Sequence, residues 1–554
     1  MAHLDPSPSD SFRRPEEPMT PIAALSERLG LPPDDVLPWG PNRAKIRLSA
    51  TRSARGRLIL VSAMNPTPGG EGKTTMSISL AMGLVQRGRN AVVALREPSL
   101  GPIFGIKGGG TGGGRATLEP ADDINLHFTG DIHAITSAHN LLAAIVDNAL
   151  YFREGPDPRK VRWRRALDMN DRALRRVIVG LDGPVRETGF DITAASEVMA
   201  IHGLFQDAAD LEARLARVVV GEQRDGTPVT AGHLNAAGAM TALLRDAMMP
   251  NLVQTAEGTP AFVHGGPFAN IAHGCSSLVQ TKLALGYADD VVTEAGFGFD
   301  LGGEKFLDIK CRTGGLWPNV VVLVATVRAL KFHGGAGAKA LSEANDAALH
   351  RGFANLDRHL DTIAALGLPA VVVVNRFPDD RDTELALVRA HLTARGVKVA
   401  LCDAFARGGE GALEFADAVI DTPTAAVEPR FTYALDASYP EKLTAVATRF
   451  YGAKEVIVSP AAAADIANIE KNGGAGLPVC IAKTPLSLTD NPALPGAPTD
   501  FPITVREMRL SAGAGFVVAL TGDIVTMPGL PKVPSAARVR LGADGRIRGL
   551  MQGD

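Results

Sequence analysis

The stretch Thr67-Pro-Gly-Gly-Glu-Gly-Lys-Thr-Thr75 decides the fold class, because it has the composition and the setting of a phosphate-binding loop. The apolar run Leu58–Val61 precedes it and suits a buried strand, whereas Met76, Leu80 and Leu84 follow it at helical spacing. The stretch is therefore predicted to join a strand to a helix. At such a turn, the free N–H groups of the first helical turn and the positive end of the helix dipole face bound phosphates.

The residue types of this loop predict an ATP site with Mg²⁺. Lys73 can reach the β- and γ-phosphate oxygens, and the hydroxyl of Thr74 can hold the metal. The predicted ATP-binding residues are Thr67, Pro68, Gly69, Gly70, Glu71, Gly72, Lys73 and Thr74. The usual G-x-x-x-x-G-K-[ST] pattern has Gly where this chain has Thr67, but the three loop glycines still leave the backbone free to wrap an anion. The alternative is a glycine-rich turn that caps an ordinary helix.

Arg96 and Glu97 follow a second strand-like run, Ala91–Leu95, which closes a β-α-β unit with parallel strands and a right-handed crossover. Ligands of open α/β sheets bind outside the carboxyl ends of the strands. Arg96 is therefore predicted to grip a transferring phosphoryl group or an acid substrate, and we expect Lys73 and Arg96 to be the catalytic residues. The alternative for Arg96 is a surface arginine at a strand end.

The segment Gly105–Gly114 contains seven glycines in ten residues, with Lys107 embedded among them. Two interpretations are open for it. It is either a flexible linker or a loop whose bare backbone closes over anions as a lid.

These strings together resemble formate–tetrahydrofolate ligases, and the resemblance extends from about residue 40 to about residue 540. Besides the phosphate loop, the matching strings are REPSLGP, GIKGGGTGGG, DINLHFTGD, DMNDR, QTAEGTP, HGGPFANIAHG, EAGFGFDLGGEKF and MPGLPK. The resemblance implies ATP-dependent ligation of formate to tetrahydrofolate in one-carbon metabolism. The implied reaction gives 10-formyltetrahydrofolate, ADP and phosphate through a formyl phosphate intermediate. It also implies a homotetramer and activation by a monovalent cation, K⁺ or NH₄⁺.

Two phenylalanines are candidates for a folate slot. Phe377 and Phe405 follow the strand-like runs Val371–Val374 and Val397–Leu401, and neighbouring parallel strands would bring the rings to one sheet edge. The alternative is that both rings are core residues under loops. The family's N-x-F-P segment matches Phe377 and Pro378, and Phe405 stands where the family has Trp. By the same resemblance, Glu97 is a polar contact to the pterin and Phe297 a wall residue.

The recurrence of strand-like runs and helical segments predicts an α/β, multidomain protein with P-loop NTPase-like parallel or mixed sheets and flanking helices. A helix over about residues 381–394 is expected between the last two runs. We predict a large P-loop nucleotide-binding domain (1–365), a smaller α/β domain that contributes the folate slot (366–450), and a C-terminal α/β domain (451–554).

The net charge, the first ten residues and the cysteines indicate which partners and which cellular compartment to expect. With 57 Lys and Arg against 60 Asp and Glu, the net charge of −3 gives no indication of a nucleic-acid or membrane partner. The first ten residues lack the pattern of a signal peptide, and the four cysteines are too scattered for a metal motif, so we expect buried thiols in a cytoplasmic protein. Two rivals remain: a P-loop ATPase that acts as a nucleotide-switched partner-binding or assembly protein, and a P-loop ligase for another small acid.

Overall fold

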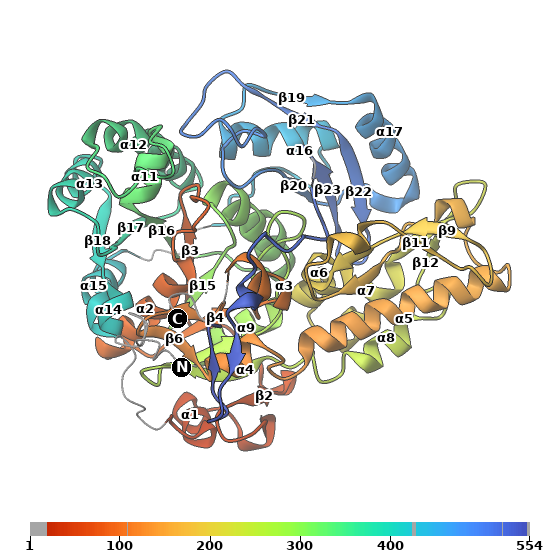
Figure 1. Ribbon diagram of the computed structural model, residues 1–554, viewed down its shortest axis with the longest axis horizontal. Helices are drawn as coiled ribbons and strands as arrows, with labels where there is room; N and C mark the ends of the chain where they lie inside the picture. Colours follow the sequence, from red (N-terminus) through yellow and green to blue (C-terminus); the bar gives the residue numbers. More distant parts are fainter. Residues whose placement is uncertain (1–18, 108, 424–427, 523, 551–554) are drawn as a thin grey trace.

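A 12-stranded mixed sheet organises the part of the chain that the computed structural model describes, residues 19–107, 109–423, 428–522 and 524–550 (Figure 1). Its main path runs β1-β2-β13-β14-β4-β15-β3-β16-β17-β18, while β6 pairs with β13 and β5 with β6. The strands are β1 (Val36–Pro38), β2 (Ala44–Ile46), β3 (Arg57–Ala63), β4 (Ala91–Leu95), β5 (Gly112–Gly113), β6 (Ala116–Glu119), β13 (Asn251–Thr255), β14 (Pro260–Val263), β15 (Asp290–Glu294), β16 (Val320–Ala325), β17 (Ala370–Asn375) and β18 (Lys398–Cys402).

The seven strands from β14 to β18 along this path are parallel, so their carboxyl ends meet at one edge. The predicted β3 and β4 are parallel as expected, but β15 lies between them and pairs with both. A strand from nearly 200 residues further along the chain thus joins the first β-α-β unit at its centre.

Both faces of this sheet are buried, which explains why its strands are almost continuously apolar. On β3, Ile59 and Val61 point into one core, and Leu58 and Leu60 into the other, as the two-residue period of a strand requires. The helices of the first core are α2 (Lys73–Gln86) and α15 (Leu413–Ile420). Those of the second include α9 (Leu278–Tyr287), α11 (Val327–His333), α12 (Asp346–Ala365) and α13 (Asp382–Ala394), and α13 matches the predicted helix.

A second lobe, at the right of Figure 1, is built on helices with short two-stranded ribbons around them. The helices are α5 (Asp131–Tyr151), α6 (Glu197–Leu204), α7 (Ala208–Arg217) and α8 (Ala237–Leu243). The strands are β7 (Arg165–Leu167), β8 (Val177–Val179), β9 (Arg186–Thr188), β10 (Phe190–Ile192), β11 (Val219–Glu222) and β12 (Pro228–Thr230).

The C-terminal lobe, blue in Figure 1, joins the other two. Along β20, Val479 and Ile481 belong to the core that α9, α11, α12 and α13 form on one face of the main sheet, whereas Cys480 and Ala482 belong to the core of the second lobe. Its elements are α16 (Tyr439–Val446), β19 (Glu455–Val458), α17 (Pro460–Ile469), β20 (Val479–Ala482), β21 (Pro502–Val505), β22 (Glu507–Ser511) and β23 (Phe516–Leu520). The hairpin of β24 (Arg540–Leu541) and β25 (Ile547–Arg548) lies apart from this lobe, at the lower centre of Figure 1.

Short helical segments complete the described chain. The α-helical ones are α1 (Ile22–Leu29), α3 (Leu100–Pro102), α4 (Ala121–Asn125), α10 (Arg312–Gly314) and α14 (Ala404–Arg407). The 3₁₀ and π segments are η1 (Pro33–Asp35), η2 (Leu48–Ala50), η3 (Ile103–Lys107), η4 (Pro158–Lys160), η5 (Arg172–Arg175), η6 (Thr193–Ala195), η7 (Phe299–Gly303), η8 (Phe306–Cys311), η9 (Gly408–Ala412), η10 (Ala447–Tyr451), η11 (Glu470–Gly474) and η12 (Ser535–Ala537).

The predicted α/β, multidomain class with a mixed sheet and flanking helices is confirmed. The main sheet continues through β17 and β18, and therefore crosses the predicted boundary at residue 365, while the three-domain division itself stays a prediction. All four cysteines are free and buried, as expected. Within the described ranges, no helix is long and apolar enough to cross a membrane.

Candidate active site

The predicted phosphate loop lies between β3 and α2, at the carboxyl edge of the parallel strands. Gly70 and Gly72 have φ angles of 79° and 75°, in the left-handed region that favours glycine. A β-carbon at Gly72 would also lie 2.5 Å from Nδ2 of Asn375, so a larger residue would displace that side chain. Thr67 has no positive φ, which explains why the chain tolerates threonine where the usual pattern has glycine.

Glu71 braces the loop from inside. Its carboxylate accepts the backbone N–H of Thr67 at 2.6 Å and the hydroxyl of Thr326, which follows β16. Its carbonyl oxygen accepts Nδ2 of Asn375, at the end of β17, at 3.1 Å. The side chain of Glu71 is buried, so its contribution to a phosphate site is to fix the shape of the backbone.

Lys73 and Thr74 open helix α2, and both are half-buried. The Thr74 hydroxyl donates to Oε2 of Glu294, the last residue of β15, at 2.9 Å. The other carboxylate oxygen of Glu294, Oε1, lies 3.4 Å from Nη2 of Arg96. The structure therefore brings the predicted metal ligand and the predicted phosphate-gripping arginine to one carboxylate.

Arg96 leaves the end of β4 with its side chain 23% exposed, so it is not a freely solvated surface arginine. Its Nη1 also donates to the carbonyl oxygen of Pro267 at 3.3 Å. A β-carbon at Gly296 would lie 3.2 Å from Nη1, so the glycine after β15 leaves room for the guanidinium.

Glu97 is almost completely buried beside it, and its backbone N–H donates to the carbonyl of Gly265 at 2.8 Å. Burial, with a further contribution from the Asp131 carboxylate, raises the pKa of Glu97 well above its usual value. Within the described residues, Oε2 of Glu97 has no hydrogen-bond partner. A protonated carboxyl at this position can both donate and accept a hydrogen bond.

Phe297 follows β15 with a φ of 59°, an uncommon conformation for a non-glycine residue. Such backbone strain concentrates at functional sites. The backbone of Phe297 therefore lies at the same edge of the sheet as Arg96 and the phosphate loop.

Phe377 and Phe405 follow the adjacent parallel strands β17 and β18, as expected. Both rings are half-buried, and Pro378 beside Phe377 is exposed. The guanidinium of Arg328 lies 4.5 Å from the centroid of the Phe377 ring. The alternative of two fully buried core rings is therefore not what the structure has.

The glycine segment packs against Phe405, a contact that the sequence did not indicate. A β-carbon at Gly113 would lie 3.0 Å from Cε2 of the ring, and one at Gly114 would overlap the carbonyl oxygen of Phe405. Arg115 donates its N–H to that same oxygen at 2.9 Å. The glycines therefore allow the hairpin β5–β6 to approach the aromatic ring.

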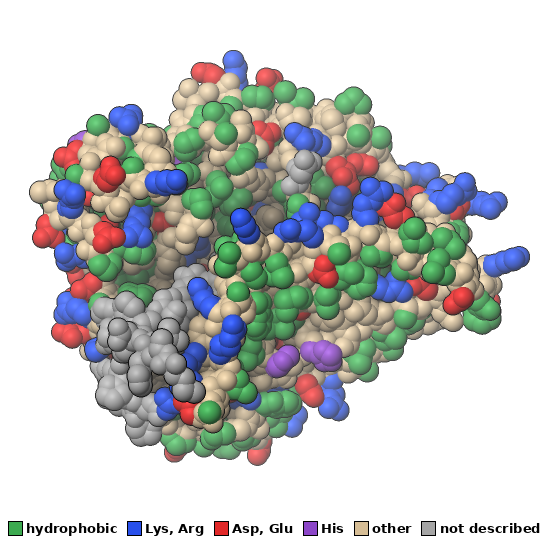
Figure 2. Space-filling view, in the orientation of Figure 1, with side chains coloured by type: hydrophobic (Ala, Val, Ile, Leu, Met, Phe, Trp, Pro, Cys, Tyr) green, Lys and Arg blue, Asp and Glu red, His purple; other side chains and the backbone are tan. Residues whose placement is uncertain are grey.

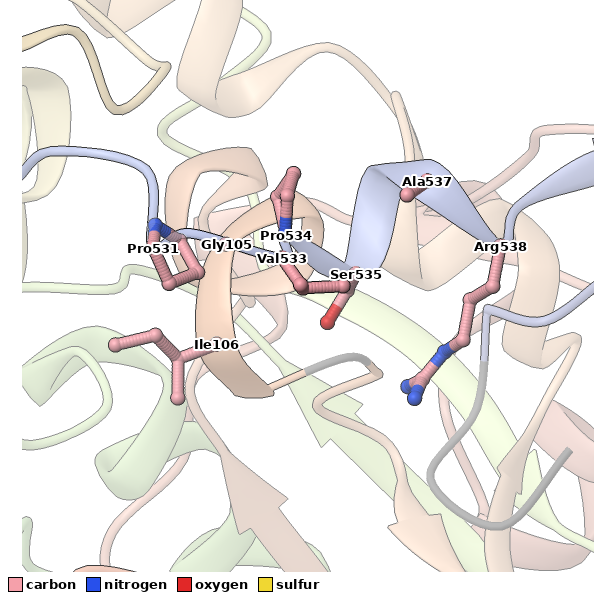
Figure 3. Close-up of a pocket in the computed structure, with 8 residues that line it drawn as sticks. All are labelled: Gly105, Ile106, Pro531, Val533, Pro534, Ser535, Ala537 and Arg538. Atoms are coloured by element: carbon pink, nitrogen blue, oxygen red, sulfur yellow. The ribbon is translucent and has the colours of Figure 1, made fainter.

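The described part of this segment is ordered by specific bonds and is not a free linker. Gly109 donates to the carbonyl of Leu550 at 2.7 Å, and Gly110 to Oδ1 of Asn125 at 2.6 Å. Gly108 and the side chain of Lys107, the predicted centre of the lid, lie outside the described residues. A pocket of about 350 Å³ separates the turn at Gly105 and Ile106 from the C-terminal segment between Pro531 and Arg538 (Figure 3).

The donors present fit a magnesium ion that arrives with nucleotide. Within the described ranges, no group of three or more His, Cys, Asp or Glu side chains could hold a metal by itself. Thr74 and Glu294 offer one hydroxyl and one carboxylate, and Mg²⁺ in nucleotide sites takes few protein ligands and completes its shell with phosphates and water.

Three residues of this arrangement were not predicted: Glu294, Thr326 and Asn375. A carboxylate that ends the apolar run Asp290–Glu294 was the available signal for Glu294, because polar side chains at strand ends gather at one edge. Thr326 and Asn375 carry no such signal, since single hydroxyls and amides end many strands.

The parallel sheet, its glycine loop and the polar side chains at the strand ends define an α/β protein of the P-loop class. The family model for formate–tetrahydrofolate ligase matches residues 9–551. A formate–tetrahydrofolate ligase of Myxococcus xanthus is 61% identical over 549 residues, which cover 97% of this chain and 99% of the relative. Those of Acidiphilium cryptum and Paracoccus denitrificans are 54% and 53% identical, over 96% of this chain and 98% and 97% of their own lengths. The chain belongs to the formate–tetrahydrofolate ligase family.

Membership in this family confirms the resemblance that the sequence motifs indicated and makes the chain an enzyme of the ligase class. It does not favour the alternative of a nucleotide-switched assembly protein.

Proposed function

We propose that this chain ligates formate to tetrahydrofolate at the expense of ATP and releases 10-formyltetrahydrofolate, ADP and phosphate. The observation that carries the proposal is the meeting of the phosphate loop and Arg96 at Glu294, with Glu97 beside them. This arrangement provides positive charge for a phosphoryl group next to a polar, buried carboxyl that suits a heteroaromatic acceptor. The relatives carry the name of this reaction.

In the first step, a formate oxygen attacks the γ-phosphorus of ATP, and the bond from that phosphorus to the β,γ-bridging oxygen breaks. The products are formyl phosphate and ADP. The N–H groups that open α2 and the ammonium of Lys73 hold the phosphates, and Arg96 neutralises the charge that develops on the transferring group. Magnesium held by Thr74 would supply further charge neutralisation.

In the second step, the N10 amine of tetrahydrofolate attacks the formyl carbon, the bond from that carbon to the phosphate oxygen breaks, and the departing phosphate takes up the proton that N10 loses. Formyl phosphate hydrolyses in water, so the site needs to close before it forms. The segment Gly105–Gly114 is the proposed lid, because Gly113 and Gly114 contact Phe405, and Gly109 and Gly110 near its middle bond to Leu550 and Asn125.

Phe377, Pro378, Phe405, Phe297 and Glu97 are the proposed folate-binding residues. The support is that the two half-buried rings follow adjacent strands and that Glu97 carries a carboxyl oxygen with no described partner. Lys and Arg side chains also gather on one face of the molecule, from its centre toward the second lobe (Figure 2), which favours the approach of polyanionic substrates.

The proposal includes three further properties, of which the family implies the first two and the scattered cysteines and the lack of a signal-peptide pattern suggest the third. These are activation by K⁺ or NH₄⁺, assembly into a homotetramer and a cytoplasmic location. Size-exclusion chromatography with light scattering, and activity in K⁺ against Na⁺ buffers, test the first two.

Incubation of the protein with Mg²⁺, ATP and tetrahydrofolate, with and without formate, tests the reaction. We expect ADP release to require formate and to match the 10-formyltetrahydrofolate formed. ADP release that is indifferent to formate would reject the proposal and favour the partner-binding ATPase. A requirement for a different small acid would retain the P-loop ligase and change its substrate.

We expect Phe405→Ala to weaken tetrahydrofolate binding without changing ATP binding, because the proposed role of the ring is to stack on the acceptor and not to hold the phosphates. Phe405→Trp should tighten tetrahydrofolate by about 0.5–1.5 kcal/mol, the range for an aromatic pair beyond simple burial. Separate titrations with tetrahydrofolate and ATP measure both effects.

Phe431→Ala is the matched control, since that ring is also half-buried but packs on Arg312 and Trp317. Unchanged folate affinity in Phe405→Ala, or a loss of stability of about 3–5 kcal/mol, would make Phe405 a packing residue only.

A further inference from the structure

Three long strings of the sequence meet where the proposed lid begins. They are REPSLGP (96–102), DMNDR (168–172) and MPGLPK (527–532). The second string follows β7 in the second lobe, and hydrogen bonds join it to both of the others. The second lobe therefore contacts both the start of the lid and the chain that leads to the C-terminus.

The carboxylate of Asp168 holds the turn that leads into the lid. Its Oδ1 accepts the hydroxyl of Ser99 at 2.6 Å, and its Oδ2 accepts the backbone N–H of Leu100, the first residue of α3, at 2.9 Å. Hydrogen bonds to a carboxylate are among the stronger ones in proteins. Asp168 therefore fixes the place at which the chain leaves Glu97 and enters α3.

Asn170 holds the next turn by close packing. Its side chain is buried, with 6% exposed. A β-carbon at Gly101 would lie 2.4 Å from Oδ1 of its amide, and one at Gly105 would lie 2.6 Å from Nδ2. The two glycines are four residues apart on the helical stretch of α3 and η3, so they face the same side. The amide fits against this stretch because both positions are glycine.

From this base the lid turns back over the residues that precede it. A β-carbon at Gly110 would lie 2.7 Å from Cβ of Pro98, which follows Glu97. Gly113 and Gly114 then meet Phe405. A displacement of the base would therefore move the part of the lid that lies beside the proposed folate-binding residues.

The same stretch of the second lobe also holds the chain that faces the lid. Nε of Arg175 donates to the carbonyl of Met527 at 2.9 Å. The continuation of that chain and the turn at Gly105 and Ile106 are the two walls of the pocket of about 350 Å³ (Figure 3). Residues 168–175 therefore contact the segments that form both walls of this opening.

We propose that Asp168 and Asn170 are positioning residues for the lid. They fix its base, Ser99–Gly105, in the place from which the glycine segment closes over formyl phosphate, and they act through the lid and not on a substrate. This inference rests on the proposed function, because the task that it assigns to the two residues is to retain the intermediate of that reaction.

A lid whose base is displaced admits water to formyl phosphate. A water oxygen then bonds to the formyl carbon, the bond from that carbon to the phosphate oxygen breaks, and formate, phosphate and a proton leave. The net result is hydrolysis of ATP that requires formate but gives no 10-formyltetrahydrofolate. The ratio of ADP released to 10-formyltetrahydrofolate formed therefore reports on the lid, separately from any general loss of activity.

The first test is this ratio in the wild type and in Asn170→Ala, with Mg²⁺, ATP, formate and tetrahydrofolate present. We expect a ratio of about one in the wild type and a rise of about 10-fold in the variant, within the roughly 100-fold loss that a misplacement of about 1 Å can cause. The excess ADP should disappear when formate is omitted. An unchanged ratio, even at a lower rate, or excess ADP without formate would overturn the proposal.

Asp168→Ala should also raise the ratio, because it removes both bonds to the base of the lid. Asp168→Asn should restore the ratio toward that of the wild type, since an amide can accept the N–H of Leu100 and donate to the hydroxyl oxygen of Ser99. A wild-type ratio in Asp168→Ala, or equal ratios in the two variants, would contradict the role of these bonds.

Gly105→Ala tests the contact with Asn170 from the side of the lid. The atoms within 4 Å of the added β-carbon all belong to the Asn170 amide. The substitution should therefore displace the amide and raise the ratio in the wild type, but change it little in Asn170→Ala, where the methyl group has room. Strict additivity would overturn the contact. Should Asn170→Ala fail to fold, an unchanged ratio in Gly105→Ala alone would have the same consequence.

Asn140→Ala is the matched control in the second lobe. The amide of Asn140, on α5, donates to the carbonyl of Ala166 at 2.9 Å and accepts its N–H at 2.8 Å, two residues before Asp168. This variant should keep the ratio of the wild type even if its melting temperature falls. A rise like that of Asn170→Ala would assign the effect to general loosening of the second lobe and overturn the proposal.

Failure of the proposed function has a different signature. In that case the wild type itself forms no 10-formyltetrahydrofolate. Failure of the present inference leaves ADP release and product formation matched in the wild type and in all variants.

Discussion

Lys73→Met should lower the kcat of formate-dependent ADP release by roughly 10²–10³-fold, the size expected for the loss of one preorganised donor to a developing charge. Lys73 is the first residue of α2, so its side chain leaves the helix at the N-terminal end, where the helix dipole already favours phosphate. Arg96→Ala should produce a loss of similar size, because Arg96 would stabilise the same transferring group from the end of β4. Both variants should keep the thermal stability of the wild type.

The measurement is kcat with all three substrates at saturation, together with the melting temperature of each variant. Arg89→Ala is the matched control for Arg96, since Arg89 pairs with Asp290 at 2.7 Å, at the opposite end of the same strand β15. Near-normal turnover in Arg96→Ala would remove this residue from the mechanism. A large loss in Arg89→Ala would show that any arginine paired with a carboxylate of β15 matters for folding.

Asp300→Asn should destabilise the protein by about 3–5 kcal/mol, because it leaves the ammonium of Lys483 buried without its counter-charge. Nζ of Lys483 lies 2.7 Å from Oδ2 of Asp300, and both side chains are fully buried. Burial opposes ionisation of Asp300, but the charges of Lys483 and His359 and the hydrogen bonds from Lys483 and Asn65 together hold the pKa of that carboxyl below its usual value.

The same ion pair also contacts the segment that leads into the phosphate loop. Oδ1 of Asp300 accepts Nδ2 of Asn65 at 3.2 Å, and Asn65 lies in the turn that leads from β3 into the loop. Lys483 follows β20 in the C-terminal lobe, so the pair connects that lobe to the loop. Asp300→Asn should therefore weaken ATP binding as well as stability.

The urea midpoint at constant m-value measures the stability effect. The double variant Asp300→Asn with Lys483→Met should recover part of the loss, because a neutral pair leaves no charge buried alone. A loss below about 1 kcal/mol in the single variant, or no recovery in the double one, would contradict this account of the pair.

The sequence by itself determined the features that depend on neighbours within a few residues. The glycines at positions 70 and 72 adopt the left-handed backbone that such a loop needs, and the strand before it and the helix after it lie where apolar spacing predicted them. The parallel direction of β3 and β4 followed from the helix between them. The long motifs were sufficient to indicate the family.

The order of the strands was decided only in the tertiary structure. Glu294 contacts Thr74 across 220 residues of sequence, because β15 enters the sheet between β3 and β4. Likewise, Gly113 and Gly114 meet Phe405 because the hairpin β5–β6 folds over the end of β18. The sheet also includes β17 and β18, which the sequence analysis assigned to a smaller domain.

The physical reason is that backbone conformation and apolar periodicity depend on nearby residues. Which strand pairs with which depends on the whole fold. Several strands buried on both faces, such as β3, β4 and β16, are nearly continuous runs of Val, Ile, Leu and Ala, so their sequences carry little information about which one pairs with which. Pairing is chosen by how the whole set of helices and strands buries its apolar surface at once, and that choice brought Thr74, Arg96 and Glu294 together.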